Sequence, residues 1–326
     1  MSKRVLITGA TGFLGFHLIE EALAQGFEVV AAVRKSSNLK HLAHLPIKQV
    51  ALDYNNPAAI TVLLQSEGID YIIHAAGQTK AKSQAEYDAT NATITAQLGM
   101  AAKQHLGLRK FVLISSLAAV GPSTNAAELL TEKTVPQPVT AYGRSKLLAE
   151  EKLRDIKLSA IILRPTAIYG PREKDIFMLV KMVKKGWDPY IGKIEQQLSF
   201  VHGRDVAAIA VKSLALQVNG TYHISDGNAY GRYVLADLTQ QQLGLKAKRI
   251  HLPLGLVKVA AKASDVWHRM LNKASIFNTE KLAELTATNW VCSIEKAKNE
   301  LGFEPQFKLD KGLEDTLKWY QQNNWI

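Results

Sequence analysis

Tyr142 and Lys146 stand four residues apart in the sequence Tyr-Gly-Arg-Ser-Lys, a spacing that places both side chains on one face of a helix. A free tyrosine, with a pKa near ~10, is a poor base at neutral pH, but a neighbouring ammonium group and an oxidised nicotinamide would both favour its phenolate form. Such a tyrosine can exchange a proton with a carbinol oxygen while a hydride moves. The pair therefore predicts hydride transfer at a carbonyl carbon.

Ser116 is a third candidate for this chemistry. Ser115 and Ser116 directly follow the apolar run 111–114, so both hydroxyl groups are expected at the carboxyl end of a strand, where α/β sheets bind ligands. Ser116 could hydrogen-bond the same substrate oxygen as Tyr142.

A glycine-rich segment at 8–15 directly follows the first apolar run and opens a helical pattern. Gly9 permits a tight turn, Gly12 lets the backbone approach a pyrophosphate, and Gly15 allows close packing of helix against sheet. The amino end of the helix then faces the phosphates with free N–H groups. The predicted dinucleotide contacts in this segment are Gly9, Thr11, Gly12, Phe13, Leu14 and Gly15.

The end of the second apolar run bears on the choice of dinucleotide. A carboxylate there would bind a ribose 2′-hydroxyl, but the chain reads Arg34, Lys35, Ser36 and Ser37. Cations and hydroxyl groups suit a 2′-phosphate, so the sequence favours NADP(H) over NAD(H). NAD(H) stays open, because Arg34 and Lys35 also suit a solvated loop. Asp53, after the third run, is placed either to meet the adenine amino group or to cap a turn.

Short apolar runs alternate with helical patterns over the first 170 residues. The runs show little polar alternation, as expected of parallel strands that are covered on both faces. The alternation predicts an α/β fold, a Rossmann doubly wound parallel sheet. The predicted strands are 5–8, 28–33, 49–52, 71–74, 111–114 and 160–163.

The pattern changes after residue 170. No clear strand is predicted within 171–198. A short strand that runs into a helix is predicted at 200–216, and further strands at 221–225 and 249–252. An amphipathic helical pattern at 252–271 favours packing against its own domain over an apolar pocket lining or a membrane surface. Its apolar positions are Leu254, Val257, Ala261, Val266 and Leu271. The predicted division is a dinucleotide-binding domain at 1–170 and 200–227, and a smaller, mostly helical substrate-binding lobe at 171–199 and 228–326.

Composition excludes several other classes. The 326 residues are 47% hydrophobic and 21% charged, as in a globular protein with a sizeable core. The net charge of +11 comes from scattered Lys and Arg without a basic arm, so no nucleic-acid partner is predicted. No apolar run reaches the ~18–20 residues of a membrane span. One cysteine, Cys292, indicates a reducing compartment, taken as the cytoplasm. His202 and His223 have no carboxylate or cysteine partner at metal-ligand spacing, so no metal site is predicted.

Seven segments in a fixed order make the chain resemble the extended short-chain dehydrogenases/reductases of the NAD-dependent epimerase/dehydratase superfamily. They are TGATGFLG at 8–15, HAAG at 74–77, Asn91, SS at 115–116, YGRSK at 142–146, RPTAIYGPR at 164–172 and FVHGRDVA at 200–207. The resemblance implies that Ser116, Tyr142 and Lys146 are the catalytic set. It also implies a homodimer that pairs through the helices of Asn91 and Tyr142. Further implied cofactor contacts are Asp53, Ala75, Ala76, Tyr142, Lys146, Pro165 and Ile168.

Departures from the sugar-nucleotide enzymes of this superfamily narrow the reaction. Dehydratases carry a Thr-Asp-Glu run after the catalytic serine position, but Leu117, Ala118 and Ala119 follow here. The arginine that clamps a diphosphate is replaced by Leu198, and a typical tyrosine by Val120. The prediction is therefore an NAD(P)-dependent oxidoreductase acting on a carbonyl or secondary alcohol of a small, apolar substrate. The tail resembles the hydroxysteroid dehydrogenase and dihydroflavonol reductase branch.

Two alternatives stay open. A nucleotide-sugar epimerase would use the same serine, tyrosine and lysine with retained NAD, and Lys184, Lys185 or Arg232 could replace the missing clamp. A non-enzymatic, cofactor-sensing protein could use the same scaffold, but it has no need of an activated tyrosine.

Overall fold

The computed structural model describes residues 3–270 and 278–326. Its centre is a sheet of seven strands in the order β11-β6-β5-β4-β1-β2-β3, in which every pairing is parallel. The doubly wound α/β sheet predicted from the sequence is confirmed. Its strands are β1 (Arg4–Thr8), β2 (Glu28–Ala32), β3 (Lys48–Val50), β4 (Tyr71–His74), β5 (Lys110–Ile114), β6 (Ala160–Pro165) and β11 (Gly220–Ile224).

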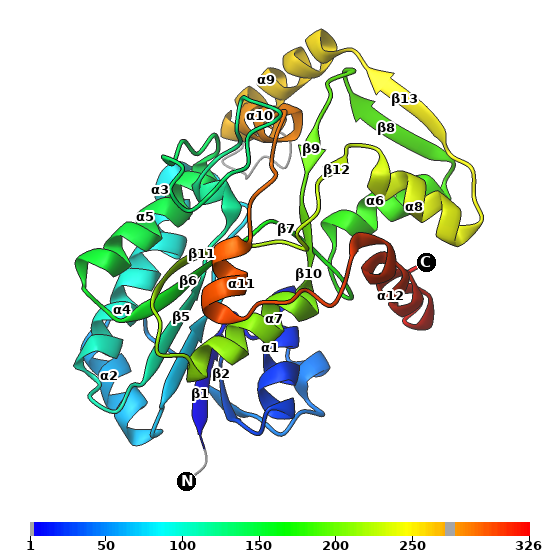
Figure 1. Ribbon diagram of the computed structural model, residues 1–326. Coiled ribbons are helices and arrows are strands. Elements are labelled where there is room, and N and C mark those ends of the chain that lie inside the picture. The colour runs from blue at the N-terminus through cyan, green and yellow to red at the C-terminus, as the bar shows by residue number, and fades with distance from the viewer. Residues whose placement is uncertain (1–2, 271–277) are drawn as a thin grey trace.

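Helices cover the sheet on both faces (Figure 1). They are α1 (Phe13–Ala24), α7 (Gly203–Lys212) and α11 (Glu295–Leu301) on one face, and α2 (Pro57–Ser66), α4 (Ile94–Gln104) and α5 (Ala141–Asp155) on the other. Val5 and Ile7 of β1 pack in the core on the α1 side, whereas Leu6 between them packs in the core on the α5 side. Because both faces are buried, the strands carry unbroken apolar runs.

The chain beyond β6 forms three small two-stranded sheets. They pair β7 (Ala167–Tyr169) with β10 (Phe200–His202), β9 (Gln197–Leu198) with β12 (Tyr230–Gly231), and β8 (Trp187–Ile191) with β13 (Lys248–Leu252). The prediction that 171–198 lacks a strand is wrong, because β8 and β9 lie there. Asp188 and Pro189 interrupt the apolar pattern of β8, and its partner β13 comes much later in the chain. Pairing with that distant strand, rather than local propensity, makes β8 a strand.

Helices complete this part of the chain. They are α6 (Asp175–Lys184), α8 (Val234–Leu243), α9 (Leu254–Met270), α10 (Thr279–Thr286) and α12 (Leu309–Gln322). Shorter turns are α3 (Gln84–Tyr87), η1 (Lys40–Leu42), η2 (Asp88–Thr93), η3 (Leu117–Ala119) and η4 (Ser213–Ala215). Leu313 and Leu317 of α12 pack with Tyr169 and Phe200, which attaches the end of the chain to the strands that follow the main sheet.

Helix α9 corresponds to the amphipathic pattern at 252–271. Val257 and Ala261 are buried against Leu282 of α10, so the predicted packing of this helix against its own protein is confirmed for those two positions. Leu271 lies outside the described residues, as does the side chain of Val266.

A buried ion pair fastens α5 to the sheet. Glu150 is fully buried, and its carboxylate accepts hydrogen bonds from Arg164 Nε at 2.9 Å and Nη2 at 2.6 Å. It also accepts from the Ser115 hydroxyl at 2.5 Å and from Arg154 Nη2 at 2.8 Å. Arg164 lies on β6 and Ser115 follows β5, so one carboxylate joins α5 to two neighbouring strands.

We expect Arg164→Met to lower the free energy of unfolding by about 3–5 kcal/mol, because it leaves a buried carboxylate without its main partner. Urea denaturation measures this loss. Arg154→Met is the matched control: it removes a half-exposed partner of the same carboxylate and should cost less than about 1 kcal/mol. Equal losses in the two variants would contradict this account.

Candidate active site

Helix α5 begins directly before the predicted tyrosine. The Thr140 side chain accepts a hydrogen bond from the N–H of Gly143 at 3.0 Å. A Cβ added to Gly143 would lie 2.3 Å from the carbonyl oxygen of Ala118, so glycine is needed for the helix to approach the turn after β5 this closely. Tyr142 and Ser116 consequently border one cavity.

The two serines after β5 have different surroundings. Ser115 is buried and donates to Glu150, so its hydroxyl belongs to the core. Ser116 borders the cavity, where its oxygen accepts from the N–H of Ala118 at 3.2 Å and its hydroxyl meets that of Tyr142. This placement supports the choice of Ser116 as the candidate site residue.

Burial governs the proton affinities of Tyr142 and Lys146. It raises the pKa of Tyr142 to about 12, against a smaller lowering by the hydrogen bond with Ser116. It lowers the pKa of Lys146 to about 8, against a smaller raising by Glu150. The Lys146 ammonium donates to the carbonyl of Ile114 at 2.9 Å and lies 6.0 Å from the centre of the Tyr142 ring. The predicted lowering of the tyrosine pKa is not a property of the protein alone; it stays a prediction for the site that holds an oxidised nicotinamide.

The turn after β1 has the form that a dinucleotide requires. Gly9 has a φ of +71°, and a Cβ there would lie 2.6 Å from the backbone of Ala75. A Cβ at Gly15 would lie 2.1 Å from the carbonyl oxygen of Gly9, so α1 packs directly on the turn. Gly12 is exposed and puts no side-chain cap over the first N–H groups of α1. Bare backbone at a helix amino end fits a pyrophosphate group.

A buried hydrogen-bond chain joins the ends of β1 and β4 beside this turn. The Thr8 hydroxyl lies 2.6 Å from His74 Nδ1, and His74 Nε2 lies 3.0 Å from the Thr95 hydroxyl. The N–H of Ala76 donates to Thr8 at 3.1 Å, which holds Ala75 and Ala76 at the edge of the turn. Burial lowers the pKa of His74 to about 3, so this histidine is neutral. Its role is to link the two threonine hydroxyl groups by hydrogen bonds and not to transfer a proton.

Asn91 connects η2 to α5, the helix that carries Tyr142 and Lys146. Its side chain accepts from the N–H of Gln78 at 2.7 Å and donates to the Ser145 hydroxyl at 2.9 Å. Ser145 in turn donates to the carbonyl oxygen of Tyr142 at 2.7 Å. The first turn of α5 is therefore tied to η2 through buried polar contacts.

The residues predicted to select the dinucleotide lie on exposed turns. Arg34 and Lys35 follow β2 and are exposed, and the Ser37 hydroxyl accepts from the N–H of Arg34 at 3.2 Å. Asp53 Oδ1 accepts from the N–H of Asn55 at 3.0 Å. That carboxylate caps a turn, and its contact with adenine stays a prediction.

The remaining predicted cofactor contacts lie near the carboxyl edge of the sheet. Some have side chains packed in the protein interior, and others do not. Phe13 packs close to Gly203 of α7, and Leu14 and Ile168 pack against the core. Their side chains therefore serve packing, which leaves backbone groups for a cofactor at these positions. Pro165 ends β6 and borders the cavity, and Thr11 lies in the turn between Gly9 and α1.

A cavity of about 430 Å³ opens between this edge and the later part of the chain. Ser116, Tyr142 and Pro165 border it from the sheet side. Its other walls are mainly apolar, and they include Pro189, Ile191, Leu198, Phe200, Leu285 and Trp290. A volume of this size matches a small-molecule site. Leu198, at the position expected for a diphosphate-binding arginine, presents an apolar surface to it.

Two charged residues of the described chain border the cavity, Arg232 and Glu284. Arg232 donates to the carbonyl oxygens of Ile191 at 3.0 Å and Ile194 at 2.5 Å. The sequence predicts Arg232 as a possible substitute clamp, but nothing in it points to Glu284. The position of Glu284 depends on how α10 packs, and its Glu-Leu-Thr context carries no motif that could have revealed it.

Lys184 and Lys185, the other proposed substitutes for the clamp, lie at the end of α6 and are exposed. Neither is among the described residues that border the cavity. Cys292 is buried beside the core of Leu117 and Leu130, and burial raises the pKa of its thiol to about 12. It has the character of a packed, unreactive thiol.

The glycine turn suited to a dinucleotide and the cavity bordered by Ser116 and Tyr142, with Lys146 on the same helix, are the arrangement of a nicotinamide-dependent enzyme of the extended short-chain dehydrogenase/reductase class. The chain belongs to the NAD dependent epimerase/dehydratase family, whose model matches residues 5–225. The resemblance stated from the sequence motifs is thereby confirmed.

Relatives of this chain include both reductases and epimerases. It is 30% identical to the ceramide reductase of Caulobacter vibrioides over 99% of this chain and 96% of the relative. It is 26% identical to the UDP-glucose 4-epimerase of Vibrio cholerae over 99% of this chain and 97% of that protein. The UDP-glucose 4-epimerase of Thermotoga maritima, solved with UDP-glucose, shares the fold with a TM-score of 0.80 at 19% identity, covering 98% and 99% of the two chains.

Within residues 3–270 and 278–326, no helix has both the length and the apolar character to span a bilayer. The same ranges contain no group of three or more His, Cys, Asp or Glu that could hold a metal ion.

Proposed function

We propose that the protein is an NADP(H)-preferring oxidoreductase that transfers a hydride between the nicotinamide and a carbonyl or secondary alcohol of a small, apolar substrate. The observation that carries this proposal is the shared cavity: Ser116 and Tyr142 border a space of about 430 Å³ whose other walls are mainly apolar. Lys146 lies behind the tyrosine on the same helix.

In the proposed reaction, Ser116 orients the substrate oxygen and Tyr142 exchanges a proton with it. The bound nicotinamide supplies or accepts the hydride. Lys146 is placed to hold the nicotinamide ribose and, once its ammonium is drawn toward the tyrosine, to favour the phenolate. The mainly apolar walls of the cavity suit an apolar group on the substrate.

The proposed preference for NADP(H) rests on Arg34 and Lys35. Both are exposed after β2, in a turn that the Ser37 hydroxyl holds, and neither forms an ion pair within the described residues. Two cations there suit a ribose 2′-phosphate.

A nucleotide-sugar epimerase is the second candidate, and Arg232 is the observation that favours it, since its charge borders the cavity without an acidic partner among the described residues. We rank it second because the Arg232 guanidinium already donates to backbone carbonyls and Leu198 replaces the usual clamp.

We further propose that 171–199 and 228–326 form the substrate-binding lobe, since more than half of the residues that line the cavity come from them. The cytoplasmic location and the homodimer through α4 and α5 remain proposals that rest on the single buried thiol and on the family resemblance.

Tyr142→Phe should lower the rate of carbonyl reduction by about 10³-fold, since it removes the group that transfers the proton. Turnover of apolar ketones and aldehydes is followed by the loss of NADPH absorbance, and cofactor affinity, measured by fluorescence, should stay within about twofold. Tyr87→Phe is the matched control, because the Tyr87 ring lies 6.3 Å from that of Tyr142 but donates its hydroxyl to Thr79. Full activity of Tyr142→Phe would refute the proposed mechanism.

Arg34→Ala should raise the Kd for NADPH by about 10-fold or more and leave the Kd for NADH nearly unchanged, because it removes a charge-assisted contact with a 2′-phosphate. Isothermal titration of both cofactors makes the measurement. Lys40→Ala, which removes an exposed cation a few residues away, should change neither value. A wild-type protein that binds NADH more tightly than NADPH would overturn the preference.

With the cofactor site saturated, UDP and dTDP should not raise the melting temperature, because the cavity lacks the arginine clamp, whereas NADPH itself should raise it by mass action. A saturable rise with either nucleotide, abolished by Arg232→Met, would move the epimerase to first place.

A further inference from the structure

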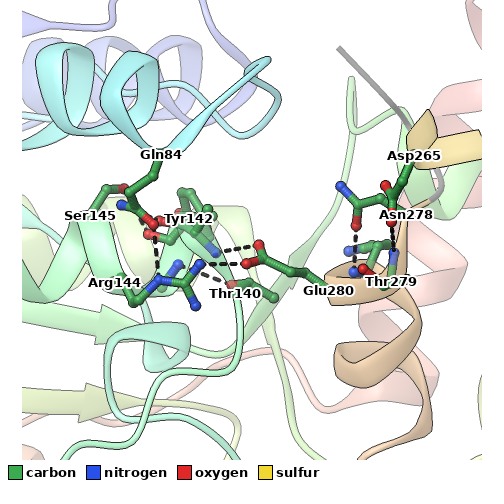
Figure 2. Close-up of polar contacts among 12 residues, drawn as sticks. Gln84, Thr140, Tyr142, Arg144, Ser145, Asp265, Asn278, Thr279 and Glu280 are labelled. Atoms are coloured by element: carbon green, nitrogen blue, oxygen red, sulfur yellow. Dashed lines mark hydrogen bonds and ion pairs between the residues drawn. The ribbon is translucent and has the colours of Figure 1, made fainter. Parts of the chain in front are cut away.

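Helix α10 docks on the first turn of the catalytic helix. The N–H of Ala141 donates to Glu280 Oε2 at 2.6 Å, and the Arg144 guanidinium donates to the other oxygen of the same carboxylate. Figure 2 shows Glu280 reaching across from α10 toward Arg144. Ala141 and Arg144 flank Tyr142 in the sequence. The contact joins segments that are more than a hundred residues apart.

Helix α5 depends on outside groups at its amino end. Its first turn contains no acidic residue of its own, although a carboxylate there is favourable to the helix dipole and its unpaired N–H groups. Thr140 satisfies the N–H of Gly143, and Glu280 satisfies the N–H of Ala141. Tyr142 therefore lies between two capped positions, one supplied locally and one supplied by α10.

Helix α10 also borders the cavity, one turn after Glu280. Glu284 is four residues after Glu280, so both side chains lie on one side of α10, and Glu284 and Leu285 border the cavity beside Tyr142. Leu282, on another side, packs on Val257 and Ala261 of α9. Helix α10 thus touches the catalytic helix, the cavity and α9 at once.

Resting on the proposed oxidoreductase function, we propose that Glu280 is a positioning residue: it fixes the first turn of α5 and so holds the Tyr142 hydroxyl at the substrate oxygen. Its carboxylate acts through the Ala141 N–H and the Arg144 guanidinium, and it has no place in the proton transfer itself. Arg144 is held from its other side by Gln84, whose side-chain oxygen lies 2.9 Å from Arg144 Nε. The first turn of α5, which carries Tyr142, is consequently bonded to α3 on one side and to α10 on the other.

Glu280→Ala should lower kcat by about 10-fold or more, because a small displacement of a reacting group is costly in rate, while the Kd for the cofactor stays unchanged. Glu280→Gln should recover part of the lost kcat, since its amide oxygen can still accept from the Ala141 N–H, whereas its NH2 group cannot accept from the Arg144 guanidinium. Melting temperatures are recorded for both variants, and rates are measured well below them.

Asp265→Ala is the matched control. Asp265 accepts from the N–H of Thr279 at 3.1 Å, at the start of α10 (Figure 2), so its loss loosens the same helix without touching α5. We expect a lower melting temperature and an unchanged kcat. A wild-type kcat in Glu280→Ala, or the same loss of kcat in Asp265→Ala, would overturn the proposed role.

A second readout does not depend on turnover. The ionisation of Tyr142 is followed by ultraviolet titration, as the difference between each protein and its Tyr142→Phe form. The ionisable groups facing Tyr142 are Lys146 on its own helix, Tyr87 on α3 and Glu284 on α10. Since burial raises the pKa of Tyr142, loosening its turn in Glu280→Ala should lower that pKa toward the ordinary value, and Glu280→Gln should lower it by less.

The two readouts separate the two claims. A wild-type protein that reduces no carbonyl substrate defeats the proposed function, and the titration then still decides the role of Glu280. An active wild type with equal titration curves and equal kcat in Glu280→Ala defeats the positioning role alone.

Discussion

The carboxylate of Glu150 is the contact on which the arrangement of the site depends. It is fully buried, and it is shared by Arg164 on β6, by the Ser115 hydroxyl after β5 and by Arg154. A buried carboxylate with unmet hydrogen bonds would be strongly unfavourable, so these partners fix where α5 can lie on the sheet. Lys146 is one turn before Glu150 on α5, and its ammonium reaches the carbonyl of Ile114 at the end of β5.

Around that anchor, the site is held mainly by buried polar contacts at the carboxyl edge of the sheet. Thr8 and His74 join β1 to β4, and Asn91 joins η2 to Ser145 of α5. Such contacts are worth more in a dry interior than in water, but only when every member has a partner. A neutral His74 meets this condition, since each of its nitrogens faces a threonine hydroxyl.

The parts of the fold that the sequence predicts are those that depend on residues close together in the sequence. The glycine turn at 8–15, the spacing of Tyr142 and Lys146, and the seven strands of the main sheet each need only a short window. β8 and β9 could not be predicted in this way, because distant partners make them strands. The raised pKa of Tyr142 also depends on burial that the later segments complete, so a local motif cannot report it.

The main sheet with α5 and the later segments of the chain contribute different parts of the site. The sheet edge supplies the serine, tyrosine and lysine, which suit reductases and epimerases of this family equally well. What differs between those reactions is the group that fills the cavity, and β8, β9 and α10 supply much of the wall that faces the sheet edge. Leu198 and Leu285 add apolar surface there, while the Arg232 guanidinium donates to the backbone carbonyls of Ile191, at the end of β8, and of Ile194 beyond it. A diphosphate would compete with those carbonyls for Arg232, whereas an apolar carbonyl compound could enter with Arg232 left in place, and this difference supports the proposed reductase over the proposed epimerase.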